Sequence, residues 1–245
     1  YSAQKENENS SNEKTTETAA RVHALSNDEA LKDLKATSGD NMLSKTLFSI
    51  ASFNENLNLK LKSTPKTAAK DKKSPFYGRK YSEFHYTNTI YNHYIHPQWD
   101  AFGSATLYLK ILFVDYTEGF AIIELIGEWN DCLHNDVMHL KREIIDELIQ
   151  HDIYKFILIC ENVMNFHGSD DSYYEEWYED ISEEEGWICC LNILPHVEDE
   201  MLSTRLQSYL NFGGIFNDVN WRPQKPLIVF KAIEGLLHGE VKRLY

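Results

Sequence analysis

The stretch Tyr154–Asp171, YKFILICENVMNFHGSDD, decides the fold that this chain is expected to adopt. Its first part, Lys155–Cys160, is a continuous apolar run, as expected for a strand that is buried on both faces of a sheet. Its second part is polar and ends on Ser169 and two aspartates, a composition that favours the start of a helix. The stretch therefore predicts a buried strand that leads directly into a helix with Ser169 at its start.

Three further strands are predicted around this stretch. Two apolar runs, Thr106–Val114 and Phe120–Ile126, are joined by Asp115–Gly119, which has the composition of a hairpin loop. Trp187–Leu194 is again continuously apolar and predicts a second strand buried on both faces. The chain is thus expected to build a sheet from a hairpin and two buried strands.

Helices are predicted between and after these strands. Apolar residues recur at helical spacing after the hairpin, and two more helices are expected over Ser172–Ser182 and Val197–Leu210. Pro226 opens a last amphipathic helix. The residues of the first pattern are Leu133, Val137, Leu140, Ile144 and Leu148. This order of elements predicts an α/β fold, a mixed sheet with helices on one or both faces.

Composition divides the chain into three parts. Residues 1–75 contain no Trp, one Tyr and two Phe, and are expected to form an extended, low-complexity N-terminal arm and linker. Residues 76–103 form an aromatic collar, and residues 104–245 form the α/β domain with an extra C-terminal helix. With 42% apolar residues, the 245-residue chain can bury one full core.

Charge follows the same division. Residues 1–75 carry 12 Lys and Arg against 10 Asp and Glu, whereas residues 76–245 carry 12 against 28. Because an acidic domain repels phosphates and anionic lipid, neither nucleic acid nor a membrane is expected to be its partner. We expect a protein partner with a basic surface instead.

Cysteine usage and hydropathy indicate the compartment. The chain has no CxxC pair, and three of its four cysteines lie in apolar runs, which favours buried thiols in a reducing environment. No apolar run approaches the length of about 20 residues that a membrane span needs. We therefore predict a cytoplasmic protein.

The apolar part of the arm lies within Met42–Leu61. Its apolar side chains either pack back on the chain's own domain or dock the arm on a partner and become ordered there. The residues predicted to dock are Leu43, Leu47, Phe48 and Phe53. A structural subunit could be held in a larger assembly by such an arm, and this role is the alternative function.

The aromatic collar combines Phe, Tyr and Trp residues with three histidines. We expect its aromatic side chains to cover one side of the core. His93 and His96 have the spacing of metal ligands, but no Cys or third His accompanies them at useful spacing, so we predict no metal site.

Two short motifs resemble a known family. GEWN, Gly127–Asn130, ends the second strand of the hairpin, and ENVMNFHGS, Glu161–Ser169, follows the buried strand. With the order of strands and helices, they resemble the STAS domain, the fold of bacterial anti-sigma factor antagonists, over roughly residues 104–217. The resemblance implies a STAS-like fold, a regulatory kinase-like protein as partner, and phosphorylation of Ser169. Gly168 and Asp170 stand where the family has an Asp and a Ser or Thr.

Ser169 has three candidate roles. As an N-cap, its hydroxyl would accept a backbone N–H, with Asp170 and Asp171 in a first turn that favours negative charge. As a phosphorylation site, it would gain about −1.5 to −2 charge and switch the binding of a partner. In the third role, Asp170 and Asp171 make the site permanently anionic, so that the domain holds a basic partner without regulation.

The residues that follow predict an acidic and aromatic helix. Nine acids occur between residues 170 and 185, with helical spacing and without the glycine of a calcium-binding loop. Such a run is typical of a solvated helix face, but the interleaved Tyr and Trp are also the side chains that most often anchor interfaces. The predicted partner-binding residues are Ser169, Asp170, Asp171, Ser172, Tyr173, Glu176, Trp177, Glu128 and Asn130.

An enzyme is the rival class. Glu128, Asp131, His134 and His167 are acid–base candidates near strand ends, where ligands often bind in α/β sheets. No nucleophile elbow, P-loop, dinucleotide-binding motif or HExxH motif accompanies them. We therefore predict no catalytic activity and no cofactor, and a non-enzymatic protein–protein interaction module.

Overall fold

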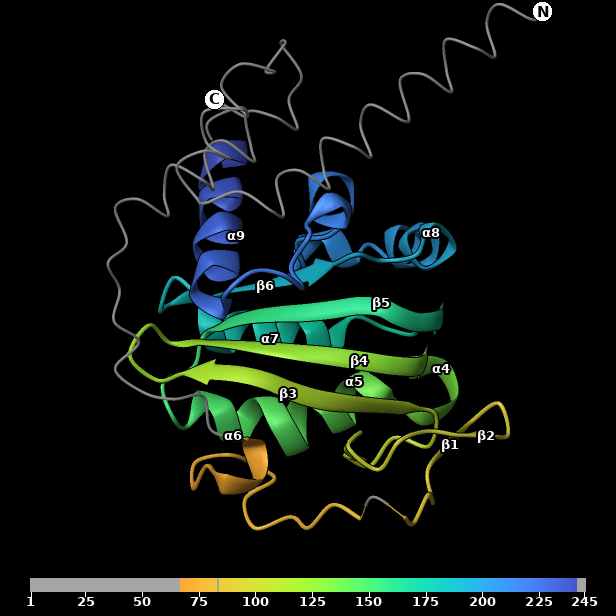
Figure 1. Ribbon diagram of the computed structural model, residues 1–245. Helices are drawn as coiled ribbons and strands as arrows, with labels where there is room; N and C mark the ends of the chain where they lie inside the picture. The colour runs from red at the N-terminus through yellow and green to blue at the C-terminus, as the bar shows by residue number, and fades with distance from the viewer. Residues whose placement is uncertain (1–66, 83, 242–245) are drawn as a thin grey trace, which may run out of the picture. The chain divides into compact units, whose positions relative to one another are not determined.

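The computed structural model describes residues 67–82 and 84–241, with side chains to Gly239 (Figure 1). The predicted arm-docking residues, Leu43, Leu47, Phe48 and Phe53, lie outside the described residues. Residues 67–75, which we predicted as linker, pack on the domain. In the short 3₁₀-helix η1 (Ala68–Lys70), Ala68 contacts the core, and the Tyr116 hydroxyl donates to Asp71 at 2.7 Å.

A four-stranded mixed sheet forms the centre of the domain. Its strands are β3 (Leu107–Asp115), β4 (Phe120–Asn130), β5 (Lys155–His167) and β6 (Trp187–Leu191), and they lie in that order. β3 pairs antiparallel with β4, while β4, β5 and β6 are parallel. The predicted α/β fold with a mixed sheet and helices is confirmed.

The helical segment after β4 is divided into short pieces. These are α4 (Asp131–His134), α5 (Asp136–Leu140), the π-helical turn η2 (Lys141–Ile145) and α6 (Asp146–Ile149). Asn135, with a left-handed φ of 52°, separates α4 from α5 and breaks the helical phase. Leu133 is therefore 79% exposed, and its predicted place on the core face is wrong.

The remaining helices follow β5 and β6. They are α7 (Ser172–Ser182), α8 (Pro195–Ser203), the 3₁₀-helices η3 (Leu206–Ser208) and η4 (Gly214–Asp218), and α9 (Pro226–Val241). The bounds of α7 are those predicted. The single helix predicted over 197–210 is instead interrupted, because Arg205 takes a left-handed φ of 61° between α8 and η3.

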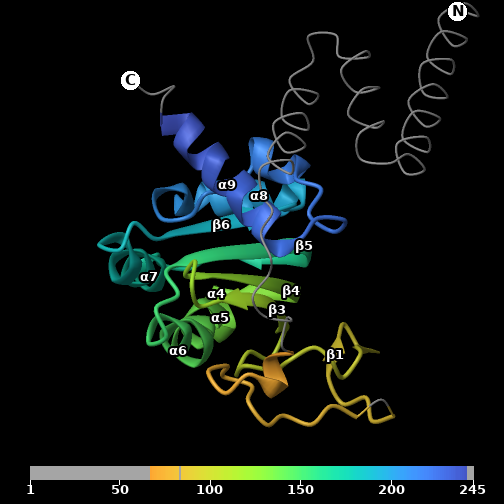
Figure 2. The same cartoon turned by 60° about the vertical axis from the view of Figure 1, so that its left-hand side comes forward.

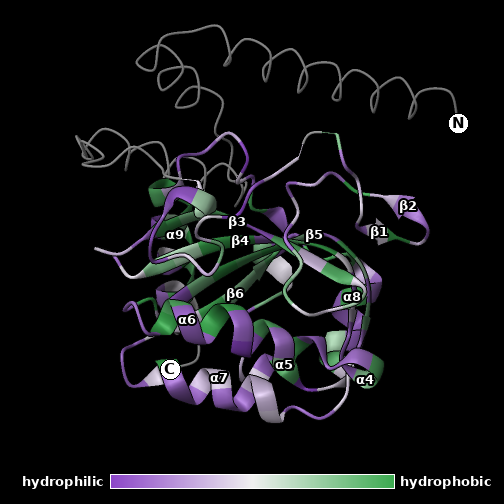
Figure 3. Cartoon of the chain, turned by 90° about the horizontal axis from the view of Figure 1, so that it is seen from below, coloured by the Kyte–Doolittle hydropathy of each residue, from purple (hydrophilic) through white to green (hydrophobic). Residues whose placement is uncertain are grey.

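The helices cover both faces of the sheet. The parallel strands follow one another in sequence order, and right-handed crossovers then place their connecting helices on one face. α5 to α8 pack on this face through residues such as Leu140, Trp177 and Met201, and α9 packs on the other face through Phe230. Figure 2 shows the sheet between α9 and the helices α5 and α6. Figure 3 shows mostly hydrophobic strands behind α5, α6 and α7, whose ribbons alternate between hydrophilic and hydrophobic residues.

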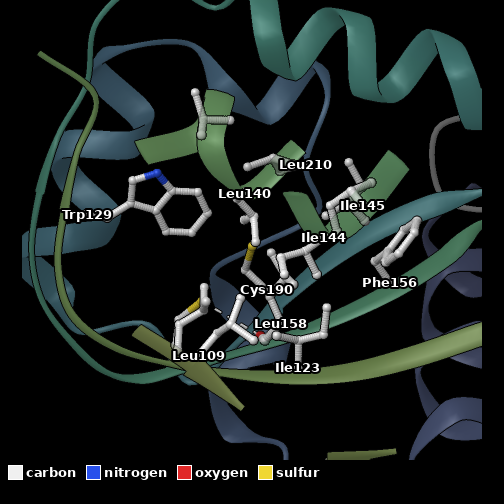
Figure 4. Packing of buried hydrophobic residues seen from close by; sticks show 14 of the residues in the cluster. Leu109, Ile123, Trp129, Leu140, Ile144, Ile145, Phe156, Leu158, Cys190 and Leu210 are labelled. Carbon is white, nitrogen blue, oxygen red and sulfur yellow. Dashed lines mark hydrogen bonds between the residues drawn. The ribbon is translucent and has the colours of Figure 1, made fainter. Parts of the chain in front are cut away.

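Two clusters of buried side chains stabilise these layers. On the first face, Leu109, Leu140, Phe156 and Leu158 are fully buried and lie close together (Figure 4). On the second face, the rings of Phe120 and Phe230 stack with centroids 4.2 Å apart. Both clusters rest on the continuous apolar runs of β4, β5 and β6, as expected for strands buried on both sides.

The aromatic collar covers the core with only some of its aromatic residues. Phe76, Trp99 and Phe102 are buried, whereas most of the others are exposed, so the expectation of a general aromatic cover is wrong. The collar contains one small hairpin, β1 (Thr89–Ile90) and β2 (His93–Tyr94). The exposed side chains are Tyr77, Tyr81, Phe84, Tyr86, Tyr91 and Tyr94.

Among the described residues, no helix combines the length and the apolar character that crossing a lipid bilayer requires.

Candidate functional site

Several of the predicted partner-binding residues lie near the carboxyl ends of β4 and β5, whereas Glu176 and Trp177 lie further along α7. These parallel strands end side by side, with Asn130 opposite His167 in the register. The loop of residues 168–171 then leads into α7. The sheet thus brings Glu128, Asn130, Ser169 and the start of α7 to one edge, where ligands and partners often bind in α/β folds.

Ser169 is exposed in this loop and does not cap the helix. The N-cap residue of α7 is Asp171, whose side chain makes no capping hydrogen bond, and the preceding Asp170 accepts from the Ser172 N–H through its Oδ1 at 3.2 Å. Asp170 also accepts from the Ser172 hydroxyl, and these bonds hold the pKa of its carboxyl below the usual range. The predicted N-cap role of Ser169 is wrong, because α7 begins at Ser172 and the residue at its N-cap position is Asp171.

Substitutions of Ser169 and Asp170 should change the free energy of unfolding by different amounts. Ser169→Ala is expected to change the free energy of unfolding by less than about 0.5 kcal/mol, as for other surface positions without a structural role. Asp170→Ala should lower it by about 1 kcal/mol, because the Ser172 N–H loses its acceptor. Urea unfolding of both variants measures these values, and a larger loss for Ser169→Ala than for Asp170→Ala would contradict this assignment.

Glu128 and Asn130 are occupied by structural contacts. Glu128 accepts hydrogen bonds from the Tyr91 hydroxyl at 2.6 Å and from the Asn165 amide at 3.2 Å. The bond from Tyr91 is the main reason that the pKa of Glu128 is lowered. Asn130 is buried, and its side chain caps α4 by accepting the Leu133 N–H at 2.9 Å. Asn130 therefore cannot contact a partner, contrary to the prediction.

One side of α7 faces the domain. Trp177 is fully buried with Tyr174 in the core, so its predicted role in partner binding is wrong. Glu176 forms a bidentate pair with the Arg142 guanidinium at 2.7 and 2.8 Å. The same guanidinium lies 5.7 Å from the ring centroid of the half-buried Tyr173. These residues fasten α7 to η2 and have little freedom to serve a partner.

The other side of α7 presents unpaired acids to solvent. Glu175, Glu179 and Glu183 are exposed and recur every four residues, so they form one line along the helix, which we call the acidic stripe. Within the described residues, no ion pair or hydrogen bond engages their carboxylates. Tyr178, 40% exposed, lies beside the stripe and packs on Tyr209 with ring centroids 6.2 Å apart.

The negative charges of the stripe extend to the neighbouring loop. The Tyr209 hydroxyl donates to Asp171 at 3.2 Å, which leaves the Asp171 side chain engaged within the domain. Burial, together with the charges of Asp171 and Glu175, raises the pKa of the Tyr209 hydroxyl. Lys141 and Arg142 are the neighbouring cations on the domain side, and both are committed to ion pairs. Neither cation pairs with a carboxylate of the stripe.

The acid–base candidates differ in how exposed their side chains are. Asp131 is buried and accepts three hydrogen bonds, from Trp129 Nε1 at 3.1 Å, the Val137 N–H at 2.8 Å and the Tyr174 hydroxyl at 2.5 Å. His134 and His167 are exposed. In the described part of the chain, no group of three or more His, Cys, Asp or Glu could hold a metal ion, and this includes His93 and His96. Asp131 is a structural residue that joins β4, α5 and α7.

Asp131 should give the domain a pH-dependent stability. Burial raises the pKa of its carboxyl from 3.8 to about 6, although the bond from Tyr174 opposes the shift. As pH rises from 4 toward 6, the unfolded chain ionises first, so this group lowers the free energy of unfolding over that range.

Asp131→Asn removes this titration and replaces the oxygen that accepts from the Tyr174 hydroxyl with an NH₂ group, and should cost about 2 kcal/mol at pH 4. The cost should shrink as pH rises to 7. Urea unfolding of wild type and variant at pH 4 and pH 7 measures both values, and a cost that is constant or grows with pH would contradict the account.

A polar pocket of about 260 Å³ lies beside the end of β6. Its wall includes Glu161, Asn192, Trp221 and Arg222. The Arg222 guanidinium lies 4.6 Å from the Trp221 ring centroid and bonds to Glu161. Sequence reasoning missed this pocket, although a Trp-Arg-Pro turn in so acidic a domain could have drawn attention to Arg222. The pairing of the guanidinium with carboxylates stabilises the turn against β5.

These features define the chain as an α/β domain whose acidic helix α7 begins after the carboxyl end of β5 and leads back to the start of β6. Comparison with protein-family models finds no match for this chain, and comparison with curated proteins finds no similar sequence.

Proposed function

We propose that the domain is a non-enzymatic protein–protein interaction module whose acidic stripe binds a basic surface of another protein. The observation that carries the proposal is the charge state of α7. Its domain-facing acids are neutralised by Lys141 and Arg142, while Glu175, Glu179 and Glu183 remain exposed and unpaired among the described residues. Because no described cation pairs with this line of charge, it is available to a basic surface.

The small energy of exposed ion pairs favours a protein surface as the partner, because such a surface can add apolar contacts. Each exposed ion pair is worth about 0.2–1 kcal/mol, so three glutamates provide selectivity and fast association more than strong binding. Binding energy then requires apolar contacts, and Tyr178 and Tyr209 lie beside the stripe to supply them. Polyanions such as nucleic acid or an anionic membrane would be repelled by the same charges.

We further propose a STAS-like regulator in the cytoplasm. Three parallel strands in sequence order, with connecting helices on one face, support the resemblance in fold. Ser169 is exposed in the loop between β5 and α7, where a kinase could reach its hydroxyl. Phosphate there would add to the charge of Asp170 and of the stripe. The thiols of the buried Cys160 and Cys190 support a reducing compartment.

The test is affinity capture from native lysate with the full chain. One variant carries Glu175→Lys, Glu179→Lys and Glu183→Lys, and a matched control carries Glu143→Lys, Asp199→Lys and Glu200→Lys, which changes net charge equally at other exposed acids. We expect a basic protein to be captured by wild type and by the control, and to be lost at least about tenfold from the stripe variant. Equal capture by all three chains would overturn the proposal.

A further inference from the structure

A second pocket, of about 280 Å³, lies between α7, the start of β6 and the segment that follows α8. Three aromatic side chains line it, those of Tyr178, Trp187 and Tyr209. Among the described residues that line it, none carries a formal charge. A water molecule takes about 30 Å³ of liquid volume, so the pocket has room for the end of a long side chain.

Contacts around the pocket hold its aromatic walls in place. The rings of Tyr178 and Tyr209 pack on each other, and Trp187 stacks on Phe230 with ring centroids 5.9 Å apart and an interplanar angle of 14°. Asn211, which also lines the pocket, is hydrogen-bonded to β6 through both its backbone and its side-chain amide. Side chains that are fixed before binding lose little conformational entropy when a ligand arrives.

The acidic stripe lies beside this pocket. Glu175 and Tyr178 are neighbours on the surface of α7, because they are three residues apart. The Tyr209 hydroxyl donates to Asp171 at 3.2 Å. Burial and the charge of Asp171 raise the pKa of this hydroxyl, and the charges of Glu175 and Glu179 raise it further. The pocket thus combines aromatic walls with negative charge close to one of them.

Aromatic rings beside carboxylates provide the chemistry that recognises an organic cation. The faces of Trp and Tyr rings attract an ammonium or guanidinium group within about 6 Å, and neighbouring carboxylates favour the same charge. We propose that the pocket binds the guanidinium or ammonium group of an Arg or Lys side chain of the partner protein, seated among Tyr178, Trp187 and Tyr209. An anionic group would be repelled by the same carboxylates.

This inference rests on the proposed function, because it names the residue of the partner that docks beside the stripe. One long cationic side chain enters the pocket, while further basic residues of the partner meet Glu175 and Glu179. The stripe then provides selectivity and fast association, and the pocket provides an anchor of the kind that dominates binding energy in protein interfaces.

NMR titration of the full chain tests the inference with small probes. The probes are Nα-acetylarginine N-methylamide, the corresponding lysine derivative and the norleucine derivative, whose side chain is uncharged. We expect the cationic probes to shift the indole N–H signal of Trp187, assigned with the variant Trp187→Phe, with a Kd on the order of 1 mM. The norleucine probe should bind at least about tenfold more weakly.

Two double variants of equal net charge locate the bound probe. Tyr178→Leu with Tyr209→Leu removes two aromatic faces and should weaken the better cationic probe about tenfold. Tyr178→Phe with Tyr209→Phe keeps both rings and should bind within about twofold of wild type. Amide signals outside the pocket report whether each variant keeps the fold. If the leucine variant does not fold, the wild-type comparison of charged and uncharged probes still decides.

The results that would overturn the inference are specific. Neither cationic probe shifts the Trp187 signal at about 50 mM, or the norleucine probe binds as tightly as the cationic ones. If no probe binds but the stripe variant loses a captured basic protein, this inference fails while the proposed function stands. If the cationic probes bind at Trp187 but all three chains of the capture experiment behave alike, the cation pocket stands while the stripe fails as a binding surface.

Discussion

Gly127→Ala is expected to lower the free energy of unfolding by about 3 kcal/mol or more. Gly127 lies in β4 with a φ of +123°, a conformation that side chains rarely adopt. A Cβ atom there would lie 2.1 Å from the carbonyl oxygen of Thr106, just before β3. Because the obstacle is backbone, a change of rotamer cannot relieve it, and the start of β3 must move away from β4.

A matched glycine gives the control. Gly235 lies in α9, and a Cβ atom added there meets no atom within 4 Å. Gly235→Ala should therefore stabilise the chain by roughly 0.5–1 kcal/mol, through helix propensity alone. Thermal or urea unfolding of the two variants compares them directly. Equal effects at the two positions would contradict the close approach of Thr106 to β4.

Lys141→Ala should have the next largest effect, a loss of about 3 kcal/mol in the free energy of unfolding. Lys141 is fully buried in the π-helical turn η2, and its ammonium group bonds to Asp146 and to Asp180 of α7, the latter at 2.6 Å. Burial alone would lower its pKa, but these two bonds raise it. Alanine would leave a cavity under α7 and two carboxylates without their shared cation.

Two further substitutions, Lys141→Met and Arg142→Ala, separate the contribution of packing to stability from that of charge. Lys141→Met keeps most of the buried volume and should recover more than half of the loss, because a buried ion pair is worth little more than a well-packed apolar side chain. Arg142→Ala removes a cation that bonds to the same Asp146, but its side chain is 44% exposed. The cost there should stay below about 1 kcal/mol. Urea unfolding that ranks Arg142→Ala above Lys141→Ala would contradict a buried clamp.

Most of the sheet could be predicted from the sequence, because continuous apolar runs identify strands that are buried on both faces. The position at which β5 ends could not be predicted in this way. Beyond Cys160 the strand loses β6 as a neighbour, since β6 ends at Leu191, and its residues become polar as one edge opens. The apolar pattern ends at Cys160 and does not reveal that β5 continues to His167, so the position of Ser169 outside α7 could not be derived from it.

The sequence also predicts only in part which face of each helix is buried. The spacing of Tyr174, Trp177 and Ile181 is that of one buried helical face, so the burial of Trp177 could have been predicted from the pattern. The exposure of Leu133 could not, because it depends on the left-handed backbone of Asn135. The partners of Glu128 and Glu176 come from Tyr91 and Arg142, residues distant in sequence, which pattern analysis does not bring together.

Hydrogen–deuterium exchange of the full chain, with and without the captured basic protein, tests the central claim most directly. We predict slower exchange over residues 172–185, which contain α7 and the acidic stripe, and unchanged exchange in β4 and α9. Protection confined to α9 or to the pocket beside Arg222, with no change in α7, would contradict the claim that the stripe is the binding surface.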